Sequence, residues 1–296
     1  MNKRKLTYFF SSMIFFSSLT PLISQPFGYP YDPYSDDLPP LSSPYVKPQE
    51  MEPSPGFPQR TSLPPSAKYL NQPRHLLSEP LSQKSSSTFG QREEDFDQEK
   101  IAEILDFWFG PLRSASSFPI NKVALWEGDK QLNDQLKKRF FQDYQKGAQG
   151  EYLSWRKTPK GLLALLLLLD IFPRHFFPGD AKMFATDKIA LALAQEGIQN
   201  GQDLELFPVE RLFFYMPFQH SEDVKMQLLS VKLYQELAKQ SPEEIRPLIH
   251  EFFVLAVKHQ ETIENFGRFP HRNLPLKRES TIKENQYLQK QSALRY

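Results

Sequence analysis

The longest apolar run of the chain lies near its middle, in the segment TPKGLLALLLLLDIFPRHFF at residues 158–177. Eight consecutive apolar residues, Leu162 to Leu169, lead directly to Asp170. Thr158 suits the N-cap of a helix, and Pro159 suits its first turn because the missing N–H is no loss there. A helix that is apolar on every side has to be buried on every side. We therefore expect the central helix of an all-α domain. It is too short for a membrane span, which needs about 20 apolar residues.

On both sides of this segment, apolar residues recur every three or four positions, as they do in amphipathic helices. No stretch alternates like a β-hairpin, and no βαβ order occurs. Short connections make consecutive helices antiparallel neighbours, so the pattern predicts an antiparallel helical bundle or array. The predicted helices span about 97–109, 129–150, 182–198, 208–216, 221–240, 242–266 and 281–290.

Capping signals mark several of these boundaries. A Ser or Asp just before periodic apolar residues is a candidate N-cap because its side-chain oxygen accepts a hydrogen bond from the first turn. Three such positions are Asp97, Asp129 and Ser221. A Ser or Thr followed three positions later by Glu has the spacing of a capping box. Two such pairs are Ser241 with Glu244 and Thr281 with Glu284.

The first 95 residues differ in composition from the rest. Of the 26 prolines, 15 lie in the first 100 residues, among many Ser, Gln, Tyr and Asp. Such a segment buries too little apolar surface to offset its ordering entropy. We expect residues 25–95 to be a disordered or extended linker, and residues 96–296 to form one all-helical domain.

The N-terminus has the pattern of a targeting segment. Basic residues at positions 3–5 precede an apolar stretch, Leu6 to Ile23, as in a secretory signal. A cleavage site of a signal peptide has a small-x-small pattern, which Leu22-Ile23-Ser24 matches poorly. An uncleaved anchor is therefore a second interpretation. We expect residues 1–24 to be a signal peptide or signal-anchor-like leader and the protein to be exported or membrane-anchored. The alternative is an unstructured leader on a cytoplasmic protein.

Charge and cysteine content narrow the function only by exclusion. The formal net charge is +1, which favours neither nucleic acid nor an acidic partner. The chain has no cysteine, which excludes disulfides, thiolate metal sites and a Cys nucleophile. It also has no phosphate-binding P-loop, dinucleotide fingerprint or nucleophile elbow. No cofactor and no metal site is expected, since the His and acidic spacings match no metal motif.

Three polar clusters stand at the ends of apolar helices, at residues 170–174, 211–223 and 266–273. Together with Leu105-Asp106-Phe107-Trp108-Phe109-Gly110 and Arg278-Glu279-Ser280-Thr281, they resemble the bacterial domain-of-unknown-function family numbered 924. The similarity covers about residues 98–290. It implies an all-helical fold of the tetratricopeptide-like superfamily and no particular activity. Ile171 and His175 stand where the family usually has Gln and Asn.

The residues of these clusters suggest a polar pocket for a small anionic ligand. His220 and His271 are candidate acid–base residues because imidazole titrates near neutrality, and Asp170 is a candidate to orient one of them. Arginines hold carboxylates or phosphates in bidentate geometry. The candidate ligand-binding residues are Arg174, Arg211, Glu222, Arg268 and Arg272.

Two other interpretations remain open at this stage. Aspartates and arginines at helix ends often pair with each other or cap backbone groups, which gives a purely structural role. Tetratricopeptide-like helix pairs also form grooves for peptides, which would make the chain an interaction scaffold without catalysis. A pocket would gather Asp170, Arg174, His220, Arg268 and His271 around one cavity. Whether the protein is an enzyme is left open.

Overall fold

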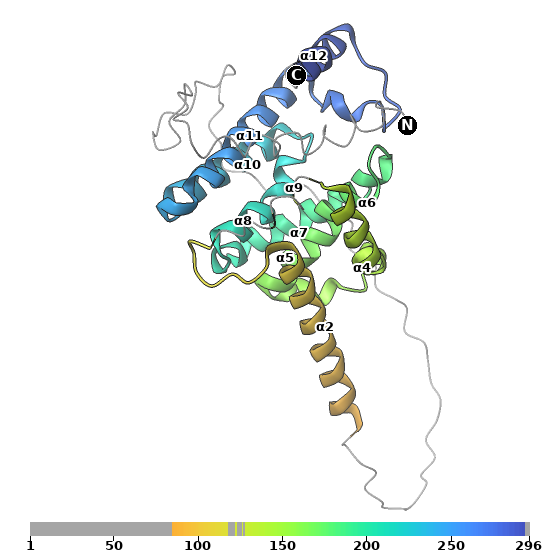
Figure 1. Cartoon of the computed structure of the whole chain (residues 1–296), viewed down its shortest axis with the longest axis vertical. Coiled ribbons are helices and arrows are strands. Elements are labelled where there is room, and N and C mark those ends of the chain that lie inside the picture. The colour runs from red at the N-terminus through yellow and green to blue at the C-terminus, as the bar shows by residue number, and fades with distance from the viewer. Residues whose placement is uncertain (1–84, 118–121, 123–125, 127, 294–296) are drawn as a thin grey trace, which may run out of the picture.

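The computed structural model describes residues 85–117, 122, 126 and 128–293. Within these ranges the regular elements are helices, which confirms the predicted all-α class (Figure 1). The predicted leader, and residues 25–84 of the predicted linker, lie outside the described residues. None of the described helices is both long and apolar enough to cross a membrane.

The α-helices are α2 (Ser85–Phe109), α4 (Lys130–Gln149), α5 (Pro159–Leu166), α6 (Phe172–Phe176), α7 (Asp187–Gln199), α8 (Pro208–Phe214), α9 (Met216–Gln219), α10 (Val224–Gln240), α11 (Arg246–Phe266) and α12 (Ile282–Ala293). Short 3-10 turns lie at Leu153–Lys157, Ala181–Phe184, Gln202–Glu205, Glu243–Ile245 and Pro270–Arg272. A π-helical segment, Leu167–Ile171, connects α5 to α6.

The central apolar segment forms the core, as its sequence predicts. Every side chain from 162 to 169 is at most 1% exposed. Helix α5 packs against α2, α7 and α8, so that it is enclosed by helices from both halves of the domain. Thr158 caps it by accepting a hydrogen bond from the backbone N–H of Gly161 (3.1 Å). Burial on all sides is what an uninterrupted apolar run requires.

Two other predicted caps are confirmed. The Asp129 carboxylate accepts from the backbone N–H of Leu132 at 3.1 Å, at the start of α4. Thr281 and Glu284 form a reciprocal capping box: Thr281 Oγ1 accepts from Glu284 N–H (3.2 Å), and Glu284 Oε2 accepts from Thr281 N–H (2.7 Å). These bonds join residues three positions apart, so they depend only on local sequence.

Several predicted boundaries are wrong. Helix α2 begins at Ser85, so residues 85–95 are helical rather than linker, and Asp97 lies inside the helix. Helix α7 begins at Asp187 instead of 182. Asp223, and not Ser221, caps α10, because its carboxylate accepts from two backbone N–H groups. The capping box at Ser241 does not form, since the Ser241 hydroxyl donates to the carbonyl of Leu237 and completes α10 instead.

Candidate functional site

The buried end of the central helix brings Asp170 against His220. Asp170 lies in the π-helical segment and has no exposed surface, while His220 follows α9 and is 7% exposed. Their side chains meet with 2.7 Å between Asp170 Oδ2 and His220 Nδ1. An ionised carboxylate can only accept, so Nδ1 carries the proton and donates it to Asp170. In this tautomer the second ring nitrogen, Nε2, carries the lone pair of the neutral imidazole.

Arg174 lies on the other side of Asp170, one helical turn later. Its guanidinium is buried, with Nη1 3.3 Å from Asp170 Oδ1, and it also donates to the backbone carbonyl of Asp170. The two Nη atoms donate to the two carboxylate oxygens of Asp187, each at 3.0 Å. This bidentate pairing fixes the guanidinium plane, as is typical of Arg–carboxylate pairs. Asp187 begins α7, so the pair joins α6 to α7.

Arg272 completes the group from the C-terminal part of the chain. It donates to the backbone carbonyl of His220 at 2.8 Å and lies 3.4 Å from Asp187 Oδ2. Its guanidinium lies 4.6 Å from the ring centroid of Phe184 and 4.6 Å from that of Phe269. Contact with aromatic rings suits a guanidinium, which is planar and weakly hydrated. Arg272 therefore fixes the backbone of His220.

The charges of this group determine its protonation. Burial raises the pKa of Asp170, but the charge of Arg174, together with the interaction and hydrogen bond with His220, outweighs this effect and holds the pKa below its usual value. Burial lowers the pKa of His220, the Arg174 charge lowers it further, and Asp170 opposes both. At neutral pH an ionised carboxylate therefore faces a neutral imidazole. Two arginines balance two aspartates, so the group as a whole is electrically neutral.

His271 and His259 lie around the same aromatic ring. The ring centroid of Phe269 is 5.1 Å from that of His259 and 5.3 Å from that of His271. Burial lowers the pKa of His271 well below its usual value, and the charge of Arg272 adds to this effect. Burial likewise lowers the pKa of His259 to about 3. Both imidazoles are therefore neutral neighbours of the Asp170–His220 pair.

Glu222 and Arg268, predicted as ligand-binding residues, lie in a neighbouring clamp. Glu222 binds Arg278 in bidentate fashion at 2.8 and 3.0 Å, and also accepts from the backbone N–H of Phe269. Arg268 binds Glu284 at 2.7 and 2.9 Å. The Glu222–Arg278 pair attaches the segment before α12 to the start of α10, and the Arg268–Glu284 pair attaches α12 to the segment that follows α11. The predicted gathering of Arg268 with Asp170, Arg174, His220 and His271 is therefore not found, because Glu284 engages its guanidinium.

Arg211 lies in a separate buried network. Its Nε donates to the hydroxyl of Tyr215 at 3.0 Å, and that hydroxyl donates to Asp203 at 2.6 Å. Its Nη1 lies 3.4 Å from Gln240. Burial raises the pKa of Tyr215, so the phenol stays protonated. The structure thus separates Arg211 from His220, although nearby sequence positions grouped them together.

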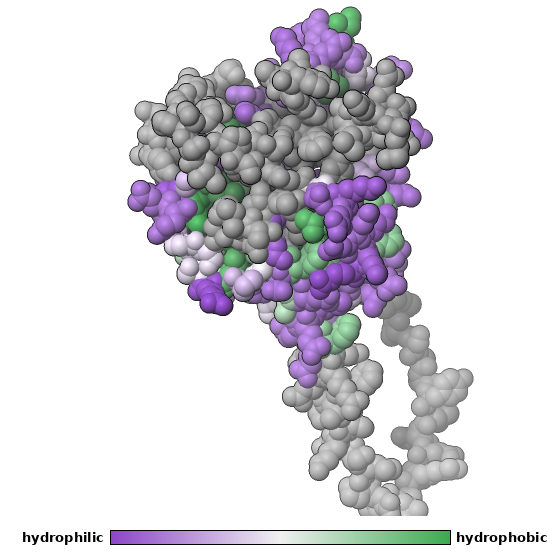
Figure 2. All heavy atoms as spheres, viewed as in Figure 1, coloured by the Kyte–Doolittle hydropathy of each residue, from purple (hydrophilic) through white to green (hydrophobic). Residues whose placement is uncertain are grey.

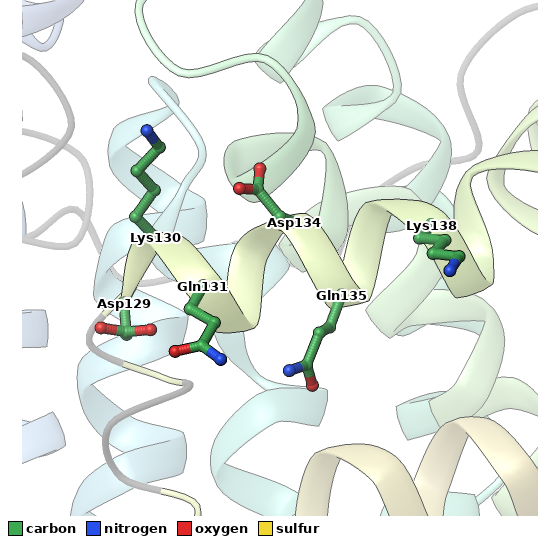
Figure 3. Close-up of a pocket in the computed structure, with 6 residues that line it drawn as sticks. All are labelled: Asp129, Lys130, Gln131, Asp134, Gln135 and Lys138. Carbon is green, nitrogen blue, oxygen red and sulfur yellow. The ribbon is translucent and has the colours of Figure 1, made fainter.

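No metal centre is evident among the residues described: no three His, Asp or Glu side chains there are arranged to hold an ion. A hollow in the surface lies along α4 (Figure 3). Its lining side chains come from one helix and its cap, and they point in different directions rather than toward a common centre (Figure 3). The lining residues are Asp129, Lys130, Gln131, Asp134, Gln135 and Lys138. The buried group around Asp170 is the better candidate because its polar atoms converge.

Sequence reasoning missed Asp187 and Thr186. Asp187 binds both arginines of the site, and the Thr186 hydroxyl donates to the backbone carbonyl of Leu169, beside Asp170. Both residues lie at the start of α7, within the helix predicted to begin at 182. A Thr followed by an Asp is typical of a helix start, where Thr can cap the helix and Asp interacts favourably with the helix dipole. This pair could have been singled out only if the helix had been predicted to begin there.

Comparison with known proteins agrees with the fold. Residues 104–292 match the family model described as bacterial protein of unknown function (DUF924). The chain belongs to this family. It is similar to the solved structure of a protein of unknown function, ATU0120 from Agrobacterium tumefaciens, with 34% identity and a TM-score of 0.56. That match covers 65% of this chain and 98% of the other. No curated protein matches. The DUF924 region contains Asp170, His220 and their partners.

Proposed function

We propose that this DUF924 domain binds a small anionic molecule beside His220 and uses His220 for acid–base chemistry on it. The observation that carries the proposal is the bond between buried Asp170 and His220 Nδ1 at 2.7 Å. A carboxylate that holds Nδ1–H selects the tautomer in which Nε2 is the base, and stabilises the imidazolium once a proton is taken up. A water molecule or a hydroxyl group of the substrate is the natural proton donor in a hydrolytic or transfer reaction.

Charge balance supports an anion as the ligand. The two arginines and two aspartates compensate one another, and His220 is neutral before the reaction. When His220 accepts a proton, the group gains one positive charge that no described side chain balances. A bound or developing negative charge would provide that balance in a buried, weakly screened setting. Anion binding and protonation of His220 should therefore favour each other.

Binding experiments on the full-length protein test this proposal. Inorganic phosphate, pyrophosphate and small mono- and dicarboxylates are screened by thermal shift, because a ligand that binds the native state raises the melting temperature. Any anion that binds is then measured by calorimetry in two buffers with different ionisation enthalpies. We expect uptake of a proton on binding and tighter binding at pH 6 than at pH 8.

Variants separate the site from general stability. His220→Gln and Asp170→Asn should weaken anion binding at least about tenfold, a change of about 1.4 kcal/mol. Arg211→Gln is the matched control, since it disturbs a buried polar network away from His220. It should lower the melting temperature and leave binding unchanged. Binding that persists without His220, or that takes up no proton, would contradict the proposal.

The alternative function, a tetratricopeptide-like scaffold for peptides, predicts a different result. A peptide groove needs a continuous apolar or amphipathic surface. Figure 2 shows one face of the molecule. Over the described residues of this face the side chains are mostly hydrophilic, with hydrophobic ones scattered among them. Among the described residues, the most exposed large apolar side chains come from separate segments of the chain, at Leu204, Leu274 and Ile282. Peptide binding without any small-anion binding would favour this alternative.

A further inference from the structure

The π-helical segment Leu167–Ile171 has a cause in the sequence. In an α-helix the carbonyl of Leu169 would accept a hydrogen bond from residue 173. That residue is Pro173, which has no N–H. Before this point the helix widens, and the N–H of Phe172 bonds to the carbonyl of Leu167, five positions back. Asp170 lies within this widened turn, so its direction depends on how the turn is held.

Thr186 supplies the donor that Pro173 lacks. Its hydroxyl donates to the carbonyl of Leu169 at 2.5 Å, and the residue is 5% exposed. Thr186 occupies the N-cap of α7, where a Thr side chain usually accepts from its own helix. Here the side chain makes no such capping bond. The hydroxyl is thus used to satisfy the central helix instead of its own.

The neighbouring residue holds the other side of the same turn. Asp187 binds Arg174, and the Arg174 guanidinium donates to the backbone carbonyl of Asp170. The start of α7 therefore fixes the two consecutive carbonyls of Leu169 and Asp170, one directly and one through Arg174. With both carbonyls held, the backbone that carries Asp170 is fixed in the position from which its side chain contacts His220.

We propose that Thr186 is a positioning residue that, with Pro173, keeps the widened turn in the register that directs Asp170 at His220. The inference rests on the function proposed for the Asp170–His220 pair. Removal of the hydroxyl takes from this buried carbonyl the donor that replaces the N–H missing at Pro173, and the turn then gains by shifting its hydrogen-bond register. Because one residue corresponds to about 100° of helix rotation, such a shift turns Asp170 away from His220.

The test reads the state of His220 directly, by nitrogen NMR of the imidazole in the full-length protein. The His220 signals are assigned by their loss in His220→Gln, and Asp170→Asn defines the spectrum of the broken pair. Thr186→Val, which removes the hydroxyl at almost constant shape, should move the His220 tautomer signals and titration midpoint toward those of Asp170→Asn. Thr186→Ser, which keeps the hydroxyl, should retain the wild-type signals.

A second variant and a control keep the inference testable if Thr186→Val does not fold. Pro173→Ala gives the Leu169 carbonyl a backbone donor that competes with Thr186, and should also shift the His220 signals toward the broken pair. Thr262→Val is the matched control, because Thr262 is equally buried and donates to the carbonyl of Lys258 within α11. It should leave the His220 signals unchanged.

Unchanged His220 signals in Pro173→Ala, and in Thr186→Val if that variant folds, would overturn the inference. This readout needs no ligand, so it is independent of whether an anion binds. If His220→Gln retains anion binding while Thr186→Val shifts the His220 signals, the proposed function fails and the positioning effect stands.

Discussion

Asp170 and His220 are 50 positions apart in the chain, yet Oδ2 of the first lies 2.7 Å from Nδ1 of the second. The contact joins the end of the central helix to the residue that follows α9. It is enclosed by an arginine on each side, Arg174 at the carboxylate and Arg272 at the His220 backbone. This relationship organises the charged interior of the domain.

We expect Asp170 and Arg174 to be strongly coupled in stability. Either Asp170→Asn or Arg174→Met leaves a buried charge without its partner, which costs about 3–5 kcal/mol. The double variant should cost clearly less than the sum of the two, because the remaining Asp187 still pairs with Arg272. A double-mutant cycle in urea measures the difference. The exposed pair Arg156–Glu196 is the control, with an expected coupling below about 1 kcal/mol. Additive costs at Asp170 and Arg174 would show that the pair is not coupled.

The central helix should be intolerant of side-chain truncation. Leu166→Ala is expected to lower the free energy of unfolding by about 2–5 kcal/mol, because Leu166 is 1% exposed and its neighbours cannot fully collapse into the cavity. Leu153→Ala is the control, since Leu153 is 44% exposed, and it should cost less than about 1 kcal/mol. Urea denaturation of both variants gives the comparison. Equal effects at the two positions would be inconsistent with a buried central helix.

Two helical glycines should respond in opposite ways to alanine. At Gly161 a Cβ would lie 2.3 Å from the backbone carbonyl oxygen of Trp155, so Gly161→Ala should destabilise the domain by about 1–3 kcal/mol despite the better helix propensity of alanine. At Gly147 the nearest atom is a Leu165 methyl group at 3.4 Å, an ordinary contact. Gly147→Ala should be neutral or stabilising by up to about 1 kcal/mol. Thermal unfolding distinguishes the two, and stabilisation by both would refute the close approach at Gly161.

Acidification should destabilise the domain below about pH 6.5. Burial lowers the pKa of His175 and of His259 to about 3, and it lowers the pKa of His220 and of His271 as well. In the unfolded chain these groups bind protons from about pH 6.5 downward, before the native state does. As far as these histidines are concerned, the free energy of unfolding is therefore highest above about pH 7.5, and it falls as the pH drops. At pH 5.5 each histidine that stays neutral in the native state costs about 1.4 kcal/mol.

Urea unfolding between pH 7.5 and pH 5.5 measures the slope of the free energy of unfolding against pH. His175→Phe removes one titrating group from the core. The free energy of unfolding should then depend less steeply on pH, because unfolding takes up about one proton fewer. A replacement at the exposed position Lys188 is the control and should leave the slope unchanged. Stability that is constant across this pH range would exclude buried neutral histidines.

The N-terminal leader should direct the protein out of the cytoplasm or into the membrane. Its basic residues at 3–5 and the apolar stretch that follows are the features a secretory pathway reads. Cell fractionation with N-terminal sequencing of the product tests this. Deletion of residues 2–24 should redirect the protein to the cytoplasm. A full-length, cytoplasmic product with the leader intact would contradict the expectation.

The sequence by itself determined the helical class, the buried central helix and the caps that act within one turn. Leu162 to Leu169 leave a helix no polar face, so burial on every side follows from composition alone. Thr158, Asp129 and the Thr281–Glu284 pair act on backbone groups three positions away, which makes them readable locally. Ser241 failed as a cap because the same hydroxyl had a competing acceptor at the end of α10.

Only the tertiary structure decided which charges meet. Arg174, Arg268 and Arg272 looked equivalent in the sequence, but Arg174 and Arg272 share Asp187, whereas Arg268 pairs with Glu284. Coulomb attraction depends on distance in space and not on separation along the chain. The same sequence is therefore compatible with several different pairings of these charges. The packing of α7 and of the C-terminal segment against the central helix selects one pairing, and with it the partnership of Asp170 with His220.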